Sequence, residues 1–447
     1  MDTRRPIFGL LLVMAAAWSS PVAMAVEDMV QIYQKAETRD PRFAGVQSSF
    51  KAVQEGRVQA RARMMLPNVT AGGSAAYNRE NTSIDGGGLS FGSGFSEYAS
   101  RGYSINLVQP VYHYDRYRQL LQADSRIRQA QLDIDAARQD LIVRTAERYL
   151  ATLTATDNLD FSRADREALS RQLEEARQRF DTGLIAITDV QEAQAGHDAA
   201  VANEIAAQKA LDDTYEALYE LTGEYHRQLA ALGSDIPLVA PEPADADRWA
   251  ETARAQNLNV AAAATAARIA AEEIKVQYAG HLPSLDLVGE TGSATGGGRF
   301  GSSTTDSSSI GLQLNVPIYE GGQVQSRTRQ ATYQHQAALD REEEARRAAV
   351  RQARSAYSGV ISGISRIEAL NQAVVSAQTA LEATRAGFEV GTRTSVDVVN
   401  QQRDLLRAKR DHADARYRYV LDVIKLKQAA GTLSPNDLGE INRWLMR

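Results

Sequence analysis

The chain contains no cysteine. That absence excludes disulfides, thiolate chemistry, Cys-ligated metals and an N-terminal lipid-bearing cysteine. After its first residues the chain also lacks an apolar run long enough for a membrane-spanning helix of about 20 residues. It has no excess of basic residues, since the formal net charge is −6, and this argues against nucleic acid as the main partner.

The first 25 residues predict a secretory signal peptide. Arg4 and Arg5 form a basic start, residues 7–18 are mostly apolar, and Ala-Met-Ala at 23–25 is a small-x-small cleavage site. The mature chain is therefore expected to begin near Val26 and to work outside the cytoplasm.

The remaining sequence is internally duplicated. Residues 179–183 match residues 387–391 at an offset of 208 (387 − 179), and further matches follow in the same order at nearly the same offset. A repeat of this kind decides the architecture. It predicts a first structural repeat over 26–235 and a second over 236–447, which also holds an equatorial segment and a C-terminal tail.

Each repeat is expected to contain very long helices. Neither 111–236 nor 318–434 contains a proline, and good helix formers dominate both stretches. Apolar residues recur every seven positions, which predicts supercoiled helix seams; they are Leu120, Ile127, Ile134 and Leu141 in the first repeat and Ala353, Val360, Ile367, Val374 and Leu381 in the second. A helix of roughly 65 residues would be about 100 Å long.

Shorter segments between the helices alternate like strands. Tyr103, Ile105 and Leu107 alternate with polar residues, as do Ile310, Leu312 and Leu314, so each predicted strand has one apolar and one polar face. Glycine- and serine-rich loops are expected over about 78–97 and 294–308. A sheet on a soluble core is one explanation. The other is a membrane barrel, which four strands cannot close, so several chains would have to share it.

Four segments resemble those of the TolC family of outer-membrane channels. They are Arg179–Gln191, Gly391–Val399, Val316–Gly322 and Ala430–Leu433. The resemblance implies a mostly α fold with a small β part, in which four strands per protomer join the β-barrel of a homotrimer in outer-membrane lipid. The helices would form a periplasmic tunnel. Its expected partners are a periplasmic adaptor protein and an inner-membrane pump of the RND or ABC type.

The resemblance also implies a latch at the inner end of the tunnel. Thr188 and Asp189 in the first inter-helix turn, with Phe388 and Arg393 at the second, match positions that link the helices there. Asp189 and Arg393 would form a charge-assisted bond. The alternative is a solvated surface ion pair, which contributes about 0 to 1 kcal/mol.

Two further sets of residues follow from the same resemblance. Asp397 matches a position that lines the narrowest part of the tunnel, and Asn400 stands where the family often has a second aspartate. An acidic ring with weakened cation preference is expected, although a helix N-terminal carboxylate would also explain Asp397. The turns, where helices end in left-handed glycines, are expected to dock the adaptor; their residues are Gly183, Leu184, Gly391 and Thr392.

Two other classes of function were weighed against a duct. The six histidines are scattered without metal-ligand spacing, and Gly296–Gly301 is not followed by the Lys-Ser/Thr of a phosphate loop, so no enzyme, metal or cofactor is expected. The alternative function is a trimeric periplasmic tether or adhesin without an open pore. Whether the cargo is drugs or polypeptides stays open.

Overall fold

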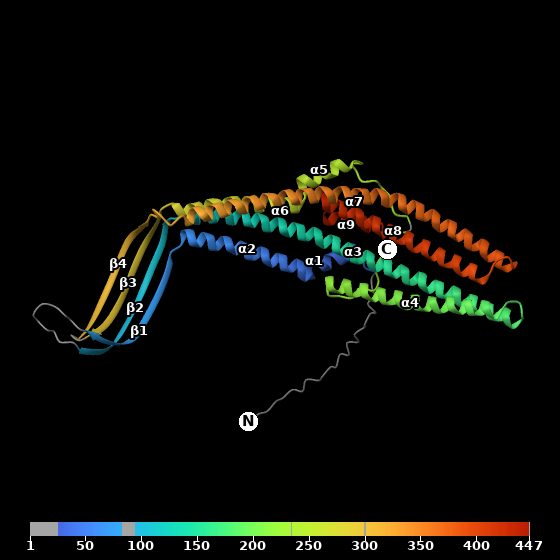
Figure 1. The fold of residues 1–447 in the computed structure, drawn as a ribbon, viewed down its shortest axis with the longest axis horizontal. Coiled ribbons are helices and arrows are strands. Elements are labelled where there is room, and N and C mark those ends of the chain that lie inside the picture. Colours follow the sequence, from blue (N-terminus) through green and yellow to red (C-terminus); the bar gives the residue numbers. More distant parts are fainter. Residues whose placement is uncertain (1–25, 83–93, 234, 299–300, 447) are drawn as a thin grey trace, which may run out of the picture.

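The structure is a computed structural model that describes residues 26–82, 94–233, 235–298 and 301–446. The predicted signal peptide, residues 1–25, lies outside these ranges. The strands occupy one end of an elongated molecule, and the turns between the longest helices occupy the other (Figure 1). Within the described part of the chain, no helix is both long and apolar enough to cross a membrane.

The elements follow the same order twice along the chain. The first set is α1 (Met29–Arg39), α2 (Pro41–Met65), β1 (Asn68–Thr82), β2 (Gly94–Tyr112), α3 (Tyr114–Asp181) and α4 (Ile187–Thr222). The second set is α5 (Ala246–Gln256), α6 (Leu258–Tyr278), a 3-10 turn (Ala279–His281), β3 (Ser284–Gly298), β4 (Gly301–Asn315), α7 (Gln323–Glu389) and α8 (Ser395–Ala430), followed by α9 (Pro435–Asn442).

The first helix of each set is broken in two, which the sequence reading did not predict. A buried residue caps the second piece in both cases. Asp40 accepts the backbone N–H of Phe43 at 3.0 Å and an Arg144 Nη at 2.7 Å. Asn257 accepts the N–H of Asn259 and donates to the carbonyl of Ala429 at 2.9 Å. These side chains satisfy backbone groups at the breaks, so both breaks are stable features of the fold.

The predicted long helices are confirmed. α3 has 68 residues and α7 has 67, so each is about 100 Å long. Heptad positions Ile134 and Leu141 in α3, and Ala353, Val360 and Ile367 in α7, are buried. α3 packs along α4, α7 packs along α8, and α3 also contacts α8, so the two helical hairpins lie side by side (Figure 1).

The four strands form one antiparallel sheet in the order β1-β2-β3-β4. Register pairs Val69 with Leu107, Leu107 with Gly289, and Gly289 with Ile310. Because residues opposite one another share a face and the side chains alternate, most of the large apolar residues of the four strands gather on one face, whereas Val108 and Val288 pair on the other. In the described residues β1 and β4 have only one neighbour each, so both edges of the sheet are open.

The predicted loop bounds were wrong, because the strands are longer than the sequence indicated. β1 continues to Thr82 and β2 starts at Gly94, while β3 and β4 run to Gly298 and from Gly301. The physical reason lies in cross-strand polar pairs, which stabilise a ladder without apolar residues. Thr291 and Ser308 hydroxyls lie 2.8 Å apart, and those of Thr295 and Thr304 lie 3.0 Å apart.

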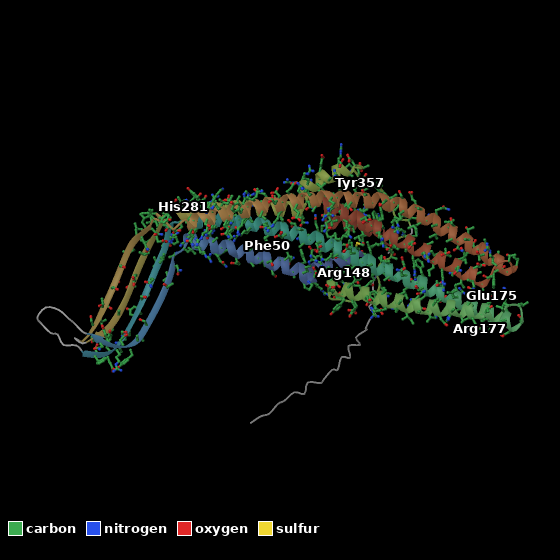
Figure 2. All side chains as sticks on the ribbon, viewed as in Figure 1. Phe50, Arg148, Glu175, Arg177, His281 and Tyr357 are labelled. Carbon is green, nitrogen blue, oxygen red and sulfur yellow. The ribbon has the colours of Figure 1, made fainter. Side chains whose placement is uncertain are left out.

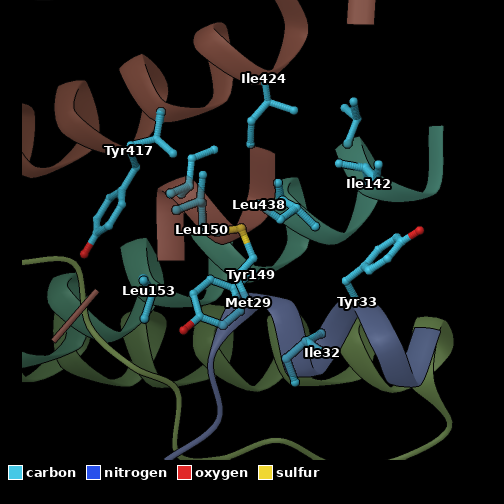
Figure 3. Packing of buried hydrophobic residues seen from close by; sticks show 14 of the residues in the cluster. Met29, Ile32, Tyr33, Ile142, Tyr149, Leu150, Leu153, Tyr417, Ile424 and Leu438 are labelled. Atoms are coloured by element: carbon cyan, nitrogen blue, oxygen red, sulfur yellow. The ribbon is translucent and has the colours of Figure 1, made fainter. Parts of the chain in front are cut away.

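The main hydrophobic core lies at mid-height, where α1 and α9 pack against α3, α4 and α8 (Figure 3). Met29 of α1, Tyr149 of α3 and Leu438 of α9 are fully buried there. The phenol of Tyr149 donates to the carbonyl of Ala230 at 2.8 Å, which fixes the segment after α4 to the core. Around this level, α5 packs against α7.

Candidate functional site

The two inter-helix turns have the same backbone construction. α3 and α7 end in the left-handed glycines Gly183 (φ 72°) and Gly391 (φ 79°). The N–H of Leu184 returns to the carbonyl of Arg179, and that of Thr392 returns to Gly387, both at 2.8 Å. These bonds satisfy the last carbonyls of each helix. Leu184 is 74 % exposed at the tip of the first turn, so the turns present accessible side chains.

Asp189 and Asp397 occupy equivalent places at the starts of α4 and α8. The carboxylate of Asp189 accepts the N–H of Ala186 at 3.2 Å. That of Asp397 accepts the N–H of Thr394 at 2.9 Å and its hydroxyl at 3.0 Å. Hydrogen bonds from Thr394, with a smaller effect of Arg393, hold the pKa of Asp397 below its usual value. Within one protomer, Asp397 therefore acts as a capping carboxylate.

Within a single protomer, the described residues show no bond between the two turns of the kind predicted for the latch. Across the residues that the structure describes, no ion pair joins Asp189 to Arg393. The Arg393 stem instead crosses Gly387, where an added Cβ would lie 2.8 Å from its Cγ. Thr188 and Arg393 are exposed, as is Asn400 on the next turn of α8.

Phe388 makes a link between the two hairpins that the sequence reading missed. The guanidinium of Arg179, on α3, lies 4.7 Å from the centre of the Phe388 ring, on α7. Arg179 also pairs at 2.7 Å with Glu175, which lies near the turn end of α3 (Figure 2). A cation over an aromatic face contributes about 0.5–1 kcal/mol at exposed sites. Only the position of both residues beside the turns could have signalled this contact.

Above the turns, α3 and α8 meet along a strip that we call the α3–α8 seam. It consists of Ser162, Asp165, Leu169 and Gln172 on α3 and Ser395, Val399 and Arg410 on α8. Gln172 donates to the carbonyl of Ser395 at 3.2 Å, and Arg410 donates to the Ser162 hydroxyl at 2.6 Å. Leu169 and Val399 are packed together with Ala200 of α4. The seam is thus narrow and largely polar.

A hollow of about 670 Å³ lies where α2, α3, α6, α7 and α8 converge. Asp140 lines it, whereas Tyr149, nine residues on and so about half a turn away, faces the core under α1 and α9. Ser355 of α7 also lines it, and Arg346, nine residues earlier, lies in the groove under α5. Arg351 lines both the hollow and the groove under α5, so the two adjoin along α7.

Paired charges line this hollow. Arg144 pairs with Asp40 and Asp140 at 2.7 and 2.9 Å, and Lys425 pairs with Glu147 at 2.8 Å. In the ranges that the structure describes, no three His, Asp or Glu side chains are placed to hold a metal ion. The turns and the seam thus join the two hairpins by a few polar and aromatic contacts.

Comparison with known proteins identifies relatives over the whole chain. The model of a family described as "Outer membrane efflux protein" matches residues 32–224 and 249–432. Outer membrane protein TolC of Vibrio cholerae is 36% identical, over 97% of this chain and 98% of that protein. The alkaline protease secretion protein AprF of Pseudomonas aeruginosa is 30% identical, over 91% and 85%. The solved structure of CusC has the same fold, with a TM-score of 0.75 at 16% identity over 96% and 99% of the two chains.

Proposed function

This chain belongs to the outer membrane efflux protein family, and from that premise we propose that three copies form the working channel. The protein is an outer-membrane exit duct of the TolC type with a periplasmic helical tunnel. Its family is one of transport proteins, and the relatives do not favour a tether without a pore. The proposal concerns how copies assemble, which partners they engage and how the duct closes.

The open edges of the sheet support the proposal that three copies assemble. β4 is exposed along its whole length, and Ile310, Leu312 and Leu314 are 79, 69 and 64 % exposed. An apolar sheet face with two unpaired edges is stable in lipid only when other strands cover both edges. Pairing β4 of one copy with β1 of the next supplies that cover, and three copies give a ring of twelve strands.

In this ring, α1, α5 and α9 are proposed to form a belt around the outside at mid-height. The two repeats, 26–235 and 236–447, are proposed to contribute equivalent helical hairpins to the wall of the tunnel. An adaptor protein is proposed to grip the turns at Gly183 and Leu184 and at Gly391 and Thr392, and an RND or ABC pump to supply the cargo from the inner membrane.

The gate is proposed to combine contacts between copies with contacts within one copy. Asp189 has no basic partner in its own protomer among the described residues, and Arg393 is exposed, so each is free to pair across a subunit boundary. Thr188 stands beside Asp189 in the same turn. Arg179 over Phe388 links the two hairpins of one copy. Asp397, with Asn400 one turn on, would form an acidic ring.

Single-channel current tests the gate directly. We expect a small current from the native protein in a planar bilayer and a clear rise for the Asp189→Ala, Arg393→Ala double variant, because a charge-assisted bond is lost. The control is Lys209→Ala, Asp213→Ala, which removes an exposed ion pair within α4. Equal, large currents from all three proteins would keep the duct and dismiss the latch. No current from any folded oligomer would contradict the assembly as an open path.

A further inference from the structure

Asp165 is a buried carboxylate in the middle of the α3–α8 seam. It lies three residues after Ser162 and four before Leu169, so all three share the face of α3 that α8 covers. Asp165 is 5 % exposed, and its neighbours Ser162 and Leu169 are 1 and 2 % exposed. A carboxylate at this depth is rare unless it is paired.

Asp165 lacks the partners that such burial normally requires. Its Oδ1 is buried and accepts no hydrogen bond in the described structure. From α8, Arg403 and Arg410 face it, but the Arg410 guanidinium donates to the Ser162 hydroxyl. Glu204 of α4 pairs with Arg163 and Arg166, which flank Asp165 along α3. In the described residues no ion pair joins Asp165 to either arginine of α8, and the Nε of Arg410 is itself buried without a hydrogen-bond partner.

An unsatisfied oxygen of this kind favours any rearrangement that returns it to water. The seam is the contact that must break if the α7–α8 hairpin swings away from α3. We propose that Asp165 is a gating residue of the duct, a carboxylate whose burial opposes closure and whose hydration favours opening. This inference rests on the proposed opening of the hairpins, and it concerns a site remote from the latch at the turns.

The titration of Asp165 has a defined sign. Burial raises its pKa in the closed arrangement, and the two arginines only partly oppose this. In an open arrangement the carboxyl would be hydrated and nearer its usual value. The closed state then binds the proton more tightly, so lowering the pH favours closure and raising it favours opening. Each unit of difference in pKa between the two states changes the equilibrium by up to about tenfold.

The test compares Asp165→Asn with Asp160→Asn, which neutralises an exposed carboxylate five residues away on the same helix. We expect Asp165→Asn to lower the open probability at pH 7.5, by up to about tenfold per unit of pKa difference. Its open probability should also respond less to a change from pH 7.5 to pH 5 than that of the native protein. Burial and the charge of Arg416 lower the pKa of His412 on α8, which is a second titratable group there, so the difference between variants is the diagnostic quantity. Asp160→Asn should behave like the native protein.

A second measurement reports closure without using current. Because the chain has no cysteine, Gln172→Cys with Ser395→Cys gives one cross-linkable pair across the seam. We expect the pair to oxidise faster when Asp165→Asn is added, because the seam is closed for longer. Faster opening or slower cross-linking in Asp165→Asn would overturn the inference, since the carboxylate would then be holding the α8 arginines. Altered cross-linking without any current would uphold the seam and contradict the proposed open path instead.

Discussion

The mid-height core and the turn end of the same helices are built differently. At mid-height, α1, α9 and the segment after α4 close one large apolar cluster around Tyr149, Ile424 and Leu438. Toward the turns, the buried apolar residues divide into small clusters such as Leu169 with Ala200 and Val399. Polar bonds, a cation over a ring and an unsatisfied carboxylate fill the space between them.

This difference indicates which part of the helical wall can move. Large apolar clusters lose several kcal/mol when they are separated, because each buried aliphatic side chain contributes roughly 1.5–3 kcal/mol. Short polar contacts exchange for water at little net cost. The mid-height core is therefore expected to stay fixed, and we call it the anchor. The turn ends of the α3–α4 and α7–α8 hairpins are expected to separate from each other, and we call them the arms.

Replacing a helix-capping glycine in each region should give the largest difference in lost stability. Gly431 and Gly183 are both left-handed, but a Cβ on Gly431 would lie 2.2 Å from the carbonyl oxygen of Gln256, whereas Gly183 faces open space. Gly183→Ala should cost only the left-handed penalty of about 1–2 kcal/mol. Gly431→Ala should cost roughly 4 kcal/mol or more, since backbone must move. Thermal melting of the purified oligomer by circular dichroism measures both, and equal melting points would contradict the anchor.

Truncating an apolar side chain in each region comes next in size. Ile424→Ala removes a fully buried side chain from the anchor and should cost about 2–5 kcal/mol of stability. Val399→Ala removes a smaller one from a three-residue cluster in the seam and should cost less than about 2 kcal/mol. It should also raise the open probability, which Ile424→Ala should not. If Ile424→Ala instead opened the folded channel, the anchor would be part of the gate.

Much of the anchor and arms could be predicted from the sequence, because the signals are local. Heptads, proline-free stretches and glycines placed the long helices and turns. The helix breaks at Asp40 and Asn257 were missed, because their capping bonds reach Arg144 and Ala429 far along the chain. Strand ends were placed too early, since serine and threonine carry little strand signal until a partner strand bonds them.

The candidate site could be predicted only in part, for the same physical reason. The sequence predicted that functional residues lie in the turns. In the structure, Asp189 and Asp397 make equivalent capping bonds at the starts of α4 and α8. It does not pair Asp189 with Arg393 in one described protomer, and contacts between copies stay a prediction. Arg179 over Phe388 and the burial of Asp165 depend on how two hairpins lie against each other. No periodicity within one helix contains that information.

Loosening the arms at Arg179 should have a smaller effect than either anchor change. Arg179→Gln removes the cation over Phe388 and should lose about 0.5–1 kcal/mol, which is a two- to fivefold rise in open probability. Arg177→Gln is the matched control, because Arg177 lies near the turn end of α3 (Figure 2) and bonds Gln194 within its own hairpin at 2.7 Å. A comparable rise in the control would mean that turn charge in general, and not the contact with Phe388, keeps the arms together.

The smallest expected effect comes from a change near the tips of the arms, where ion selectivity is proposed to be set. Asn400→Asp adds a second carboxylate one turn from Asp397 and should strengthen both cation preference and block by polyvalent cations. Because the pKa of Asp397 is held below its usual value, its charge is present above that lowered pKa and is lost only as the pH falls through it. Cation preference, read from the reversal potential in a salt gradient, should therefore persist to about pH 4. The control is the neutral change Gln402→Asn, at a half-buried position two residues further along the same helix. If Asn400→Asp left the selectivity unchanged, the narrowest point of the path would lie nearer the mid-height anchor than the arms.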